Sequence, residues 1–205
     1  MARLKPGERE RILAAIAKAE RHTVAEFAVA IVHSVDHYAE FRLLLPALLA
    51  IAADPLLVAA GVITSLAWAA AVPALIFIIG SALLLPNAVV VRLVPKGIRH
   101  ARARRLARAL FVELGLTLPR QRSGVLLFVA LSERMVEILP GPTVAERVES
   151  SRWQAIVGRL AEAAGSGRLA EGVAEAIEGC GAVLAEALPA AGPNLDEVPN
   201  RLIEL

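Results

Sequence analysis

One stretch of the chain, residues 43–91, is almost free of charge and limits what the protein can fold into. It covers 49 residues and holds a single charged side chain, Asp54. About 20 apolar residues suffice for a helix to cross the ~30 Å hydrocarbon core of a bilayer. One helix of the whole stretch would measure roughly 73 Å at 1.5 Å per residue, which is too long for one crossing. We therefore expect a transmembrane hairpin, with spans near residues 43–63 and 69–91.

The composition of the whole chain supports this interpretation. Of the 205 residues, 57% are hydrophobic, and the mean hydropathy is +0.60. Soluble domains contain about 45–50% apolar residues, and disordered chains contain fewer. The competing interpretation is a hairpin buried in the core of a soluble protein. A small domain cannot bury so long a segment on all sides, which favours the membrane.

Asp54 is the one acidic residue within the predicted spans. A carboxylate in the middle of a membrane helix costs about 2.5–3.5 kcal/mol. It could form a proton or ion site. Alternatively, it could reach a polar interface, break the helix as part of an Asp-Pro pair, or face the other helix in its protonated form. No second charge is present to form a relay, so the sequence favours the structural alternatives. Transport would also require several copies of the chain to form a pathway.

Basic residues flank the predicted hairpin on both sides and predict its orientation. Residues 92–108 carry seven Lys or Arg and no acid, and the segment before the hairpin is also basic. By the positive-inside rule, both termini lie in the cytoplasm of a multi-pass protein of the cell (inner) membrane. Each basic residue near anionic lipid contributes about 1 kcal/mol. The residues expected to contact lipid headgroups are Arg99, Arg102, Arg104, Arg105 and Arg108. We expect no nucleic-acid partner, because no aromatic residues interleave with these arginines to stack on bases.

Outside the hairpin, the pattern alternates between helix and strand and predicts an α/β (α+β) domain, a small central sheet flanked by helices. The expected elements are a helix at 6–21, a strand at 24–32, a basic helix ending near 114, strands at 123–131 and 135–139, a helix capped by Thr143 and a last helix ending before Pro189. The domain is thus assembled from residues 1–42 and 92–191, and the hairpin, residues 43–91, is an insertion. Residues 192–205 form a polar C-terminal tail.

Several segments together resemble the TPM domain family. They comprise a helix-to-strand segment, a buried strand, a strand hairpin and parts of two helices: Ala19–Val29, Ser123–Ala130, Ser132–Ile138, Trp153–Val157 and Gly172–Gly181. With its inserted hairpin, the chain is most similar to the bacterial membrane-protein branch of that family. The resemblance covers nearly the whole chain and implies a TPM-like domain interrupted by the transmembrane hairpin.

The resemblance also implies two classes of function. The first is a non-enzymatic interaction module for assembly or quality control at the membrane, whose partner is another membrane protein or a second copy of the chain. The second is a phosphate-ester hydrolase, because some relatives are described as acid phosphatases. Some relatives bind calcium, but this chain has Ser123 where relatives often carry an acid, and Gly165–Arg168 where they often have a Gly-Asp pair. Calcium prefers carboxylate oxygens, so we expect no cofactor.

The residues that could carry catalysis are Glu20, Glu26 and Glu133, which lie near predicted strand ends. Paired carboxylates can perform acid–base chemistry, and the competing interpretation is capping and surface solvation. Glu26 is the most unusual, because it begins an otherwise apolar strand. We expect no metal site, since His33 and His37 lack a third ligand. Cys180 falls on the apolar face of its helix, which favours a core residue over a nucleophile.

Overall fold

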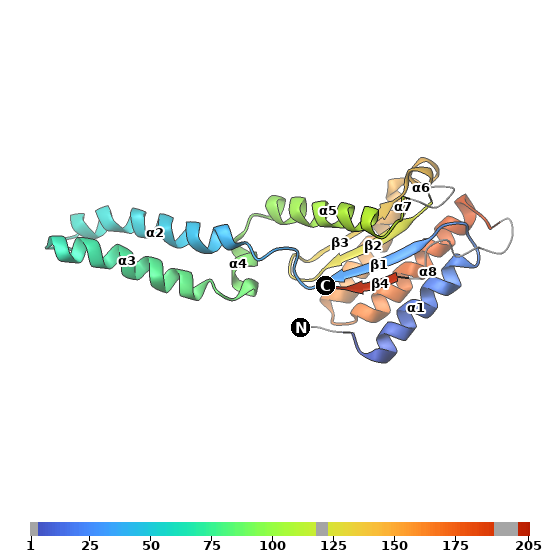
Figure 1. Cartoon of the computed structure of the whole chain (residues 1–205), viewed down its shortest axis with the longest axis horizontal. Coiled ribbons are helices and arrows are strands. Elements are labelled where there is room, and N and C mark those ends of the chain that lie inside the picture. The colour runs from blue at the N-terminus through green and yellow to red at the C-terminus, as the bar shows by residue number, and fades with distance from the viewer. Residues whose placement is uncertain (1–3, 118–122, 191–200) are drawn as a thin grey trace. The chain divides into compact units, whose positions relative to one another are not determined.

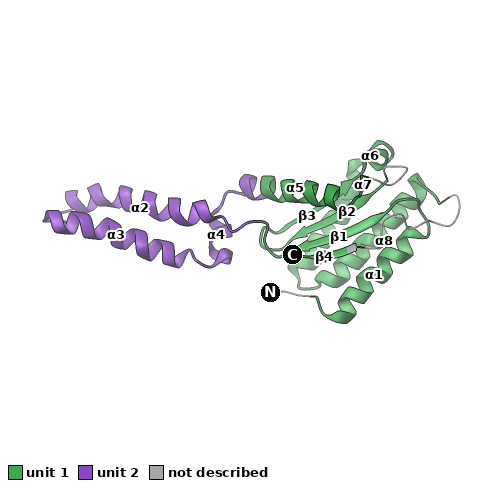
Figure 2. Cartoon of the chain, in the orientation of Figure 1, with its two compact units in different colours: residues 1–35, 100–205 green, residues 36–99 purple. Residues whose placement is uncertain are grey.

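The computed structural model describes residues 4–117, 123–190 and 201–205 and divides into two compact units. Figure 2 shows them in separate colours. The first unit combines Met1–Val35 with His100–Leu205, and the second is Asp36–Arg99. The second unit is thus inserted, in sequence, into the first.

The first unit is built on a four-stranded sheet with the strand order β3-β2-β1-β4. β1 pairs in parallel with both β2 and β4, whereas β2 and β3 form an antiparallel hairpin. The strands are β1 (Phe27–Val32), β2 (Val125–Ala130), β3 (Met135–Pro140) and β4 (Arg201–Glu204). The predicted small central sheet flanked by helices is confirmed.

Helices cover both faces of this sheet, as Figure 1 shows. Every residue of β1 and β2 is buried, which explains why both strands are continuously apolar. One face packs against α1 (Pro6–Glu20), α7 (Ser150–Gly165) and α8 (Leu169–Ala187), and the other packs against α5 (Lys96–Glu113). Alternate side chains of β1 divide between the faces: Val29 and Ile31 point toward the three-helix layer, and Ala28 and Ala30 toward α5.

Two predicted features of the segment after β3 differ in the structure. A short helix, α6 (Pro142–Arg147), begins after the N-cap Gly141, so Thr143 lies within the helix and does not cap it. The chain then leaves the helical conformation at Val148, and α7 starts afresh at Ser150. Proline is favoured in the first turn of a helix, because its missing N–H would have no partner there.

The end of the chain contributes a strand where the sequence predicted only a polar tail. Residues Arg201–Glu204 form β4, and Leu202 lies in the core. The side chain of Glu204 accepts a hydrogen bond from the backbone N–H of Leu4 at 3.1 Å. It also forms an ion pair with Arg9 at 3.0 Å. β4 is therefore attached both to β1 and to the segment that begins α1. Residues 192–200 of the expected tail lie outside the described residues.

The second unit consists of two long apolar helices and one short helix. They are α2 (Ala39–Ala59), α3 (Leu66–Leu83) and α4 (Asn87–Leu93). Both α2 and α3 are long and apolar enough to cross a membrane. The first begins and ends four residues before the predicted span. The second ends at Leu83, well short of residue 91, and Pro86 precedes the separate helix α4.

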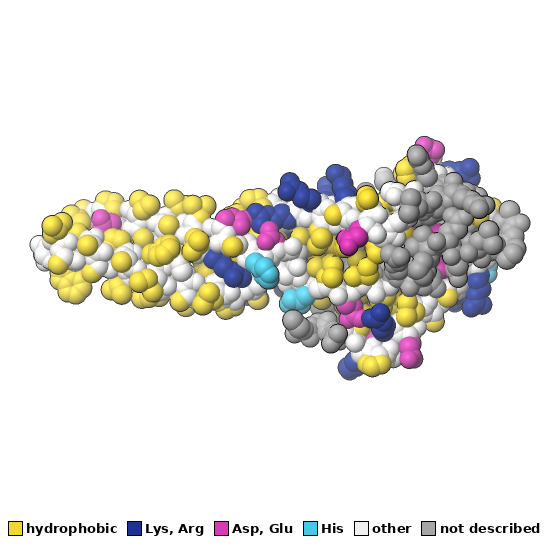
Figure 3. Space-filling model, viewed as in Figure 1, with side chains coloured by type: hydrophobic (Ala, Val, Ile, Leu, Met, Phe, Trp, Pro, Cys, Tyr) yellow, Lys and Arg dark blue, Asp and Glu magenta, His cyan; other side chains and the backbone are white. Residues whose placement is uncertain are grey.

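On the face that Figure 3 shows, the surface of α2 and α3 is largely apolar. No residue of α3 is buried, and α2 buries only Pro46 and Ala50. The two helices touch closely at Gly80, where an added Cβ would come within 2.9 Å of the Pro46 Cβ. Glycine at this position therefore permits close packing of the hairpin.

Candidate functional site

Two of the predicted acids, Glu20 and Glu26, lie at the amino end of β1. Both side chains are buried, with 3% and 2% of their surface exposed. Oε1 of Glu20 accepts a hydrogen bond from the backbone N–H of Phe27 at 2.9 Å. Glu20, the last residue of α1, therefore fixes the first residue of the strand that follows.

Buried hydroxyl groups surround this end of the sheet. Oγ1 of Thr23 donates to the backbone carbonyl of Leu188 at 2.7 Å, and Oγ of Ser123 donates to that of Val24 at 2.9 Å. Thr23 and Ser123 are both fully buried. The polar side chains here connect α8, β1 and the segment before β2. This role is structural, and a function of Glu20 or Glu26 would have to be compatible with it.

Glu133 lies at the opposite end of the sheet, in the turn between β2 and β3. Its Oε1 accepts hydrogen bonds from the backbone N–H of Val35 at 3.1 Å and from the hydroxyl of Ser34 at 3.3 Å. A six-residue strand such as β1 spans roughly 20 Å. The structure therefore brings Glu20 and Glu26 together but does not place Glu133 with them, so the three acids cannot share one pocket.

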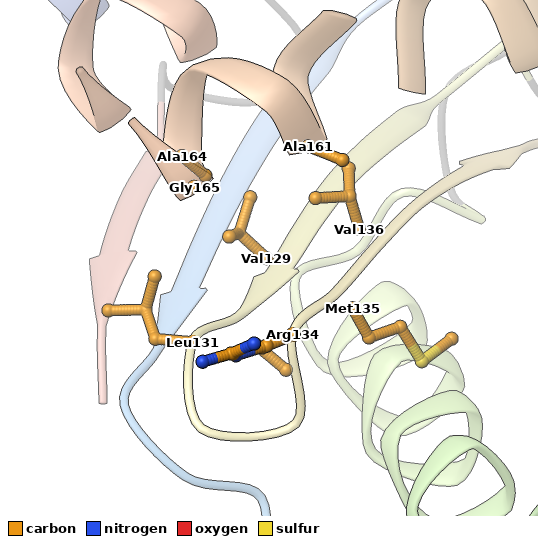
Figure 4. Close-up of a pocket in the computed structure, with 9 residues that line it drawn as sticks. Val129, Leu131, Arg134, Met135, Val136, Ala161, Ala164 and Gly165 are labelled. Atoms are coloured by element: carbon orange, nitrogen blue, oxygen red, sulfur yellow. The ribbon is translucent and has the colours of Figure 1, made fainter. Parts of the chain in front are cut away.

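A cavity of ≈ 340 Å³ lies beside the same turn, between it and the last turn of α7. Figure 4 shows the residues around it. Most of the walls are apolar or small, and the only charged side chain among them is that of Arg134. The lining residues are Val129, Ala130, Leu131, Arg134, Met135, Val136, Ala161, Ala164 and Gly165.

Arg134 lies in the tight turn that borders this cavity. Its φ is +52°, in the left-handed region, where the chain reverses between β2 and β3. Ligands of α/β sheets bind near the carboxyl ends of the strands, and the cavity is at the carboxyl end of β2. A cation among apolar walls can hold an apolar group that carries a negative charge. Nothing in the local sequence distinguishes Arg134 as a site residue, because no local pattern reveals that α7 ends next to this turn.

The arginines predicted to contact lipid headgroups lie on α5. Ala103, Ala107 and Leu110 turn toward the sheet and are buried. On the other sides of the helix, Arg104, Arg105 and Arg108 are exposed, whereas Arg99 and Arg102 are half-buried. Arg104 also pairs with Glu137 of β3 at 3.3 Å. Arg105 and Arg108 are thus exposed members of the set that form no ion pair with the described residues.

The predicted core cysteine, Cys180, is buried in α8, and burial raises the pKa of its thiol to about 12. A thiol that stays protonated at neutral pH is a poor nucleophile. Within residues 4–117, 123–190 and 201–205, no group of three or more His, Cys, Asp or Glu side chains is placed to hold a metal ion.

Comparisons with known proteins agree with the resemblance seen in the sequence. Residues 87–183 match the model of the TPM domain family. In structure, the chain is similar to the BA42 protein of the psychrophilic bacterium Bizionia argentinensis, with a TM-score of 0.61 over 98% of this chain and 95% of that one. The sequence identity is 17%, so this similarity concerns the fold. No curated protein matches the chain significantly.

Proposed function

We propose that this chain holds a TPM-like domain at a membrane as a non-enzymatic interaction module. The match of residues 87–183 to the TPM domain supports the first part of this proposal. The module would serve the assembly or quality control of membrane proteins. The observation that carries the proposal is the pair of long apolar helices, α2 and α3, inserted in the chain between β1 and α5.

The dimensions of these helices suit a bilayer. α2 has 21 residues and α3 has 18, which correspond to about 32 Å and about 27 Å at 1.5 Å per residue. Their exposed side chains include Ile51, Leu56 and Ile78, each at least 61% exposed. Soluble proteins rarely expose apolar patches larger than a few hundred Å². Lipid is therefore the environment that best explains this surface.

The proposed orientation follows the charge of the flanking segments. Exposed basic residues, among them Arg92, Lys96, Arg105 and Arg108, follow α3 in the sequence, whereas residues 60–65 between α2 and α3 carry none. The positive-inside rule favours a multi-pass protein of a bacterial inner membrane, with both termini in the cytoplasm. The TPM-like domain would then face the cytoplasm, and Arg105 and Arg108 would contact anionic headgroups.

The cavity beside Arg134 supports the interaction role. Its apolar walls and single guanidinium group suit an apolar side chain next to an acid on a partner membrane protein. A photo-crosslinking residue at Arg134, compared with one at the exposed Arg159 on α7, tests this in intact cells. We expect an adduct from position 134 that disappears when Ala164→Trp fills the cavity. Equal adducts at both positions, or an adduct insensitive to Ala164→Trp, would contradict the interaction role. An adduct with a second copy of the chain would identify the partner as a homo-oligomer.

A phosphate-ester hydrolase is the second proposal, and it too rests on Arg134. A guanidinium group binds phosphate oxygens well, and this one borders a cavity large enough for a small monoester. The purified protein would be assayed against a panel of phosphate monoesters, with and without a chelator. Turnover that is lost in Arg134→Gln would place hydrolysis at this cavity. Turnover that is lost in Glu26→Gln and retained in Arg134→Gln would place it at the amino end of β1 instead. Turnover equal in all variants would exclude both sites.

A further inference from the structure

The short helix α4 does not belong to either of the two long apolar helices, but its outward side is also apolar. Val89 and Leu93 are four residues apart, which places them on one face of the helix. They are 41% and 54% exposed, and Leu85, just before the helix, is 65% exposed. An exposed apolar face of this kind suits the boundary between headgroups and acyl chains of a bilayer.

The opposite side of α4 is packed and holds the helix in place. Val90 and Val91 are buried with Val94, Leu84 and Tyr38 in a separate small core of the second unit. Tyr38 is completely buried and, with φ at +49°, reverses the chain at the start of α2. The outward direction of Val89 and Leu93 is therefore determined by packing on their far side.

Hydrogen bonds to Asn87 reinforce this arrangement at the first residue of α4. Its Nδ2 donates to the backbone carbonyl of Asp36 at 3.2 Å, and its Oδ1 accepts from the guanidinium of Arg42 at 3.3 Å. Asp36 in turn accepts from the backbone N–H groups of His37 and Tyr38. α4 is thus bound to the base of α2 and does not hang freely from the end of α3.

Basic side chains accompany the apolar face. Arg92, within α4, and Lys96, three residues after its end, are exposed. Apolar side chains next to exposed basic ones are typical of helices that lie in the interface of an anionic bilayer. Only three residues separate α3 from α4, so the two helices end and begin within roughly 14 Å of each other. If α3 ends at the membrane surface, α4 therefore lies there too.

We infer that α4 is an interfacial helix, with Val89 and Leu93 at the boundary between acyl chains and headgroups and with Arg92 and Lys96 on anionic headgroups. The inference rests on the proposed membrane function. It adds a lipid-contacting surface distinct from the arginines of α5, and it assigns the partner as an anionic lipid surface.

The test uses the full chain with Cys180→Ala, reconstituted in vesicles of phosphatidylethanolamine and phosphatidylglycerol. Single cysteines at Val89, Leu93, Ile78 and Gln154 carry an environment-sensitive fluorophore. Nitroxide-labelled lipids quench it either near the headgroup or deep in the bilayer. Ile78 reports insertion of α3, and Gln154, exposed on α7, serves as the aqueous control.

We expect the shallow quencher to act on Val89 and Leu93, the deep quencher to act on Ile78, and neither to act on Gln154. If Val89 and Leu93 behave like Gln154 while Ile78 is quenched, the inference is wrong and the proposed function stands. If Ile78 is not quenched, both fail. Combined Arg92→Gln and Lys96→Gln should cause a loss of shallow quenching at Val89, and Arg152→Gln on α7 should leave it unchanged. Unchanged quenching in the double variant would overturn the assigned role of anionic headgroups.

Discussion

The carboxylate of Glu133 lies 3.1 Å from the backbone nitrogen of Val35, although 98 residues separate them in the sequence. This hydrogen bond ties the turn between β2 and β3 to the segment that leaves β1. It therefore holds Val35, the last residue before the second unit begins, against the sheet of the first unit.

Glu133→Ala should destabilise the protein because it leaves the N–H of Val35 without its acceptor. Loss of a partner costs a fully buried polar group about 1–3 kcal/mol, and this hydrogen bond is partly buried, so we expect a loss near the lower end of that range. Urea unfolding of the detergent-solubilised chain, followed by circular dichroism, measures the difference. Glu133→Gln retains an acceptor oxygen and is the control, expected to lose less. Equal stability of Glu133→Ala and the parent chain would show that the bond contributes nothing.

We expect the same substitution at two glycines to have opposite effects on the stability of the protein. A Cβ at Gly124 would overlap the carbonyl oxygen of Leu116 and approach the Leu116 Cβ at 2.8 Å, whereas a Cβ at Gly158 meets nothing within 4 Å. Gly124→Ala should destabilise by about 1–3 kcal/mol through overpacking. Gly158→Ala, in the exposed middle of α7, should stabilise by about 0.5–1 kcal/mol. The same urea unfolding measurement gives both changes in stability. Changes of the same sign would contradict the difference in packing between Gly124 and Gly158.

The thiol of Cys180 should be unreactive in the folded protein. Because burial raises its pKa from 9.0 to about 12, the folded state holds the proton more tightly than the unfolded state does. The resulting stability is present below pH 9 and is lost as the pH rises toward 12. Maleimide labelling at pH 8, read by mass spectrometry, should be slow in the folded chain and fast in urea. Rapid labelling without urea would show that the thiol is accessible.

The exposed arginines of α5 should select anionic lipid. Combined Arg105→Gln and Arg108→Gln should weaken the retention of anionic lipid by about 1 kcal/mol per charge removed. Native mass spectrometry of protein released from mixed-lipid nanodiscs counts the lipids retained. The matched control, Arg152→Gln with Arg159→Gln, removes two exposed arginines from α7. An equal loss in both pairs would indicate a general charge effect without a site on α5.

The proposed orientation predicts which residues are reachable from outside the cell. In a Cys180→Ala background, a cysteine at Ser65 between the two long helices should react with an impermeant maleimide in intact cells. A cysteine at Gln154 should react only after the cells are permeabilised. The reverse pattern would place the TPM-like domain outside the cytoplasm and would overturn the positive-inside assignment.

The strands of continuous apolar sequence were predictable, and β4 was not. β1 and β2 are buried on both faces, so their residues carry a strong local signal. β4 has only Leu202 and Ile203 between two charged residues, and its stability comes from pairing with β1 far away in the sequence. The predicted second span, residues 69–91, extends beyond the end of α3. Hydrophobic residues continue through Pro86 into α4, but α3 itself ends before them.

The candidate site was predictable only in part. The sequence placed Glu20, Glu26 and Glu133 near strand ends, which the structure has. It could not show that Glu133 lies at the other end of the sheet from Glu20, because that depends on the parallel pairing of β1 and β2. The cavity beside Arg134 requires the end of α7 to meet the β2–β3 turn, a contact that no local pattern encodes.

The position of β1 has a consequence for how the protein is made. β1 is a central strand, yet both of its neighbours, β2 and β4, are encoded after α2 and α3. At 5–20 residues per second, a ribosome needs roughly 5–20 s to proceed from the end of β1 to the end of β2. The apolar hairpin therefore emerges from the ribosome while β1 is still an unpaired strand. If the hairpin enters a membrane as proposed, its capture would precede folding of the domain, and the sheet would be completed on a chain already tethered to the bilayer.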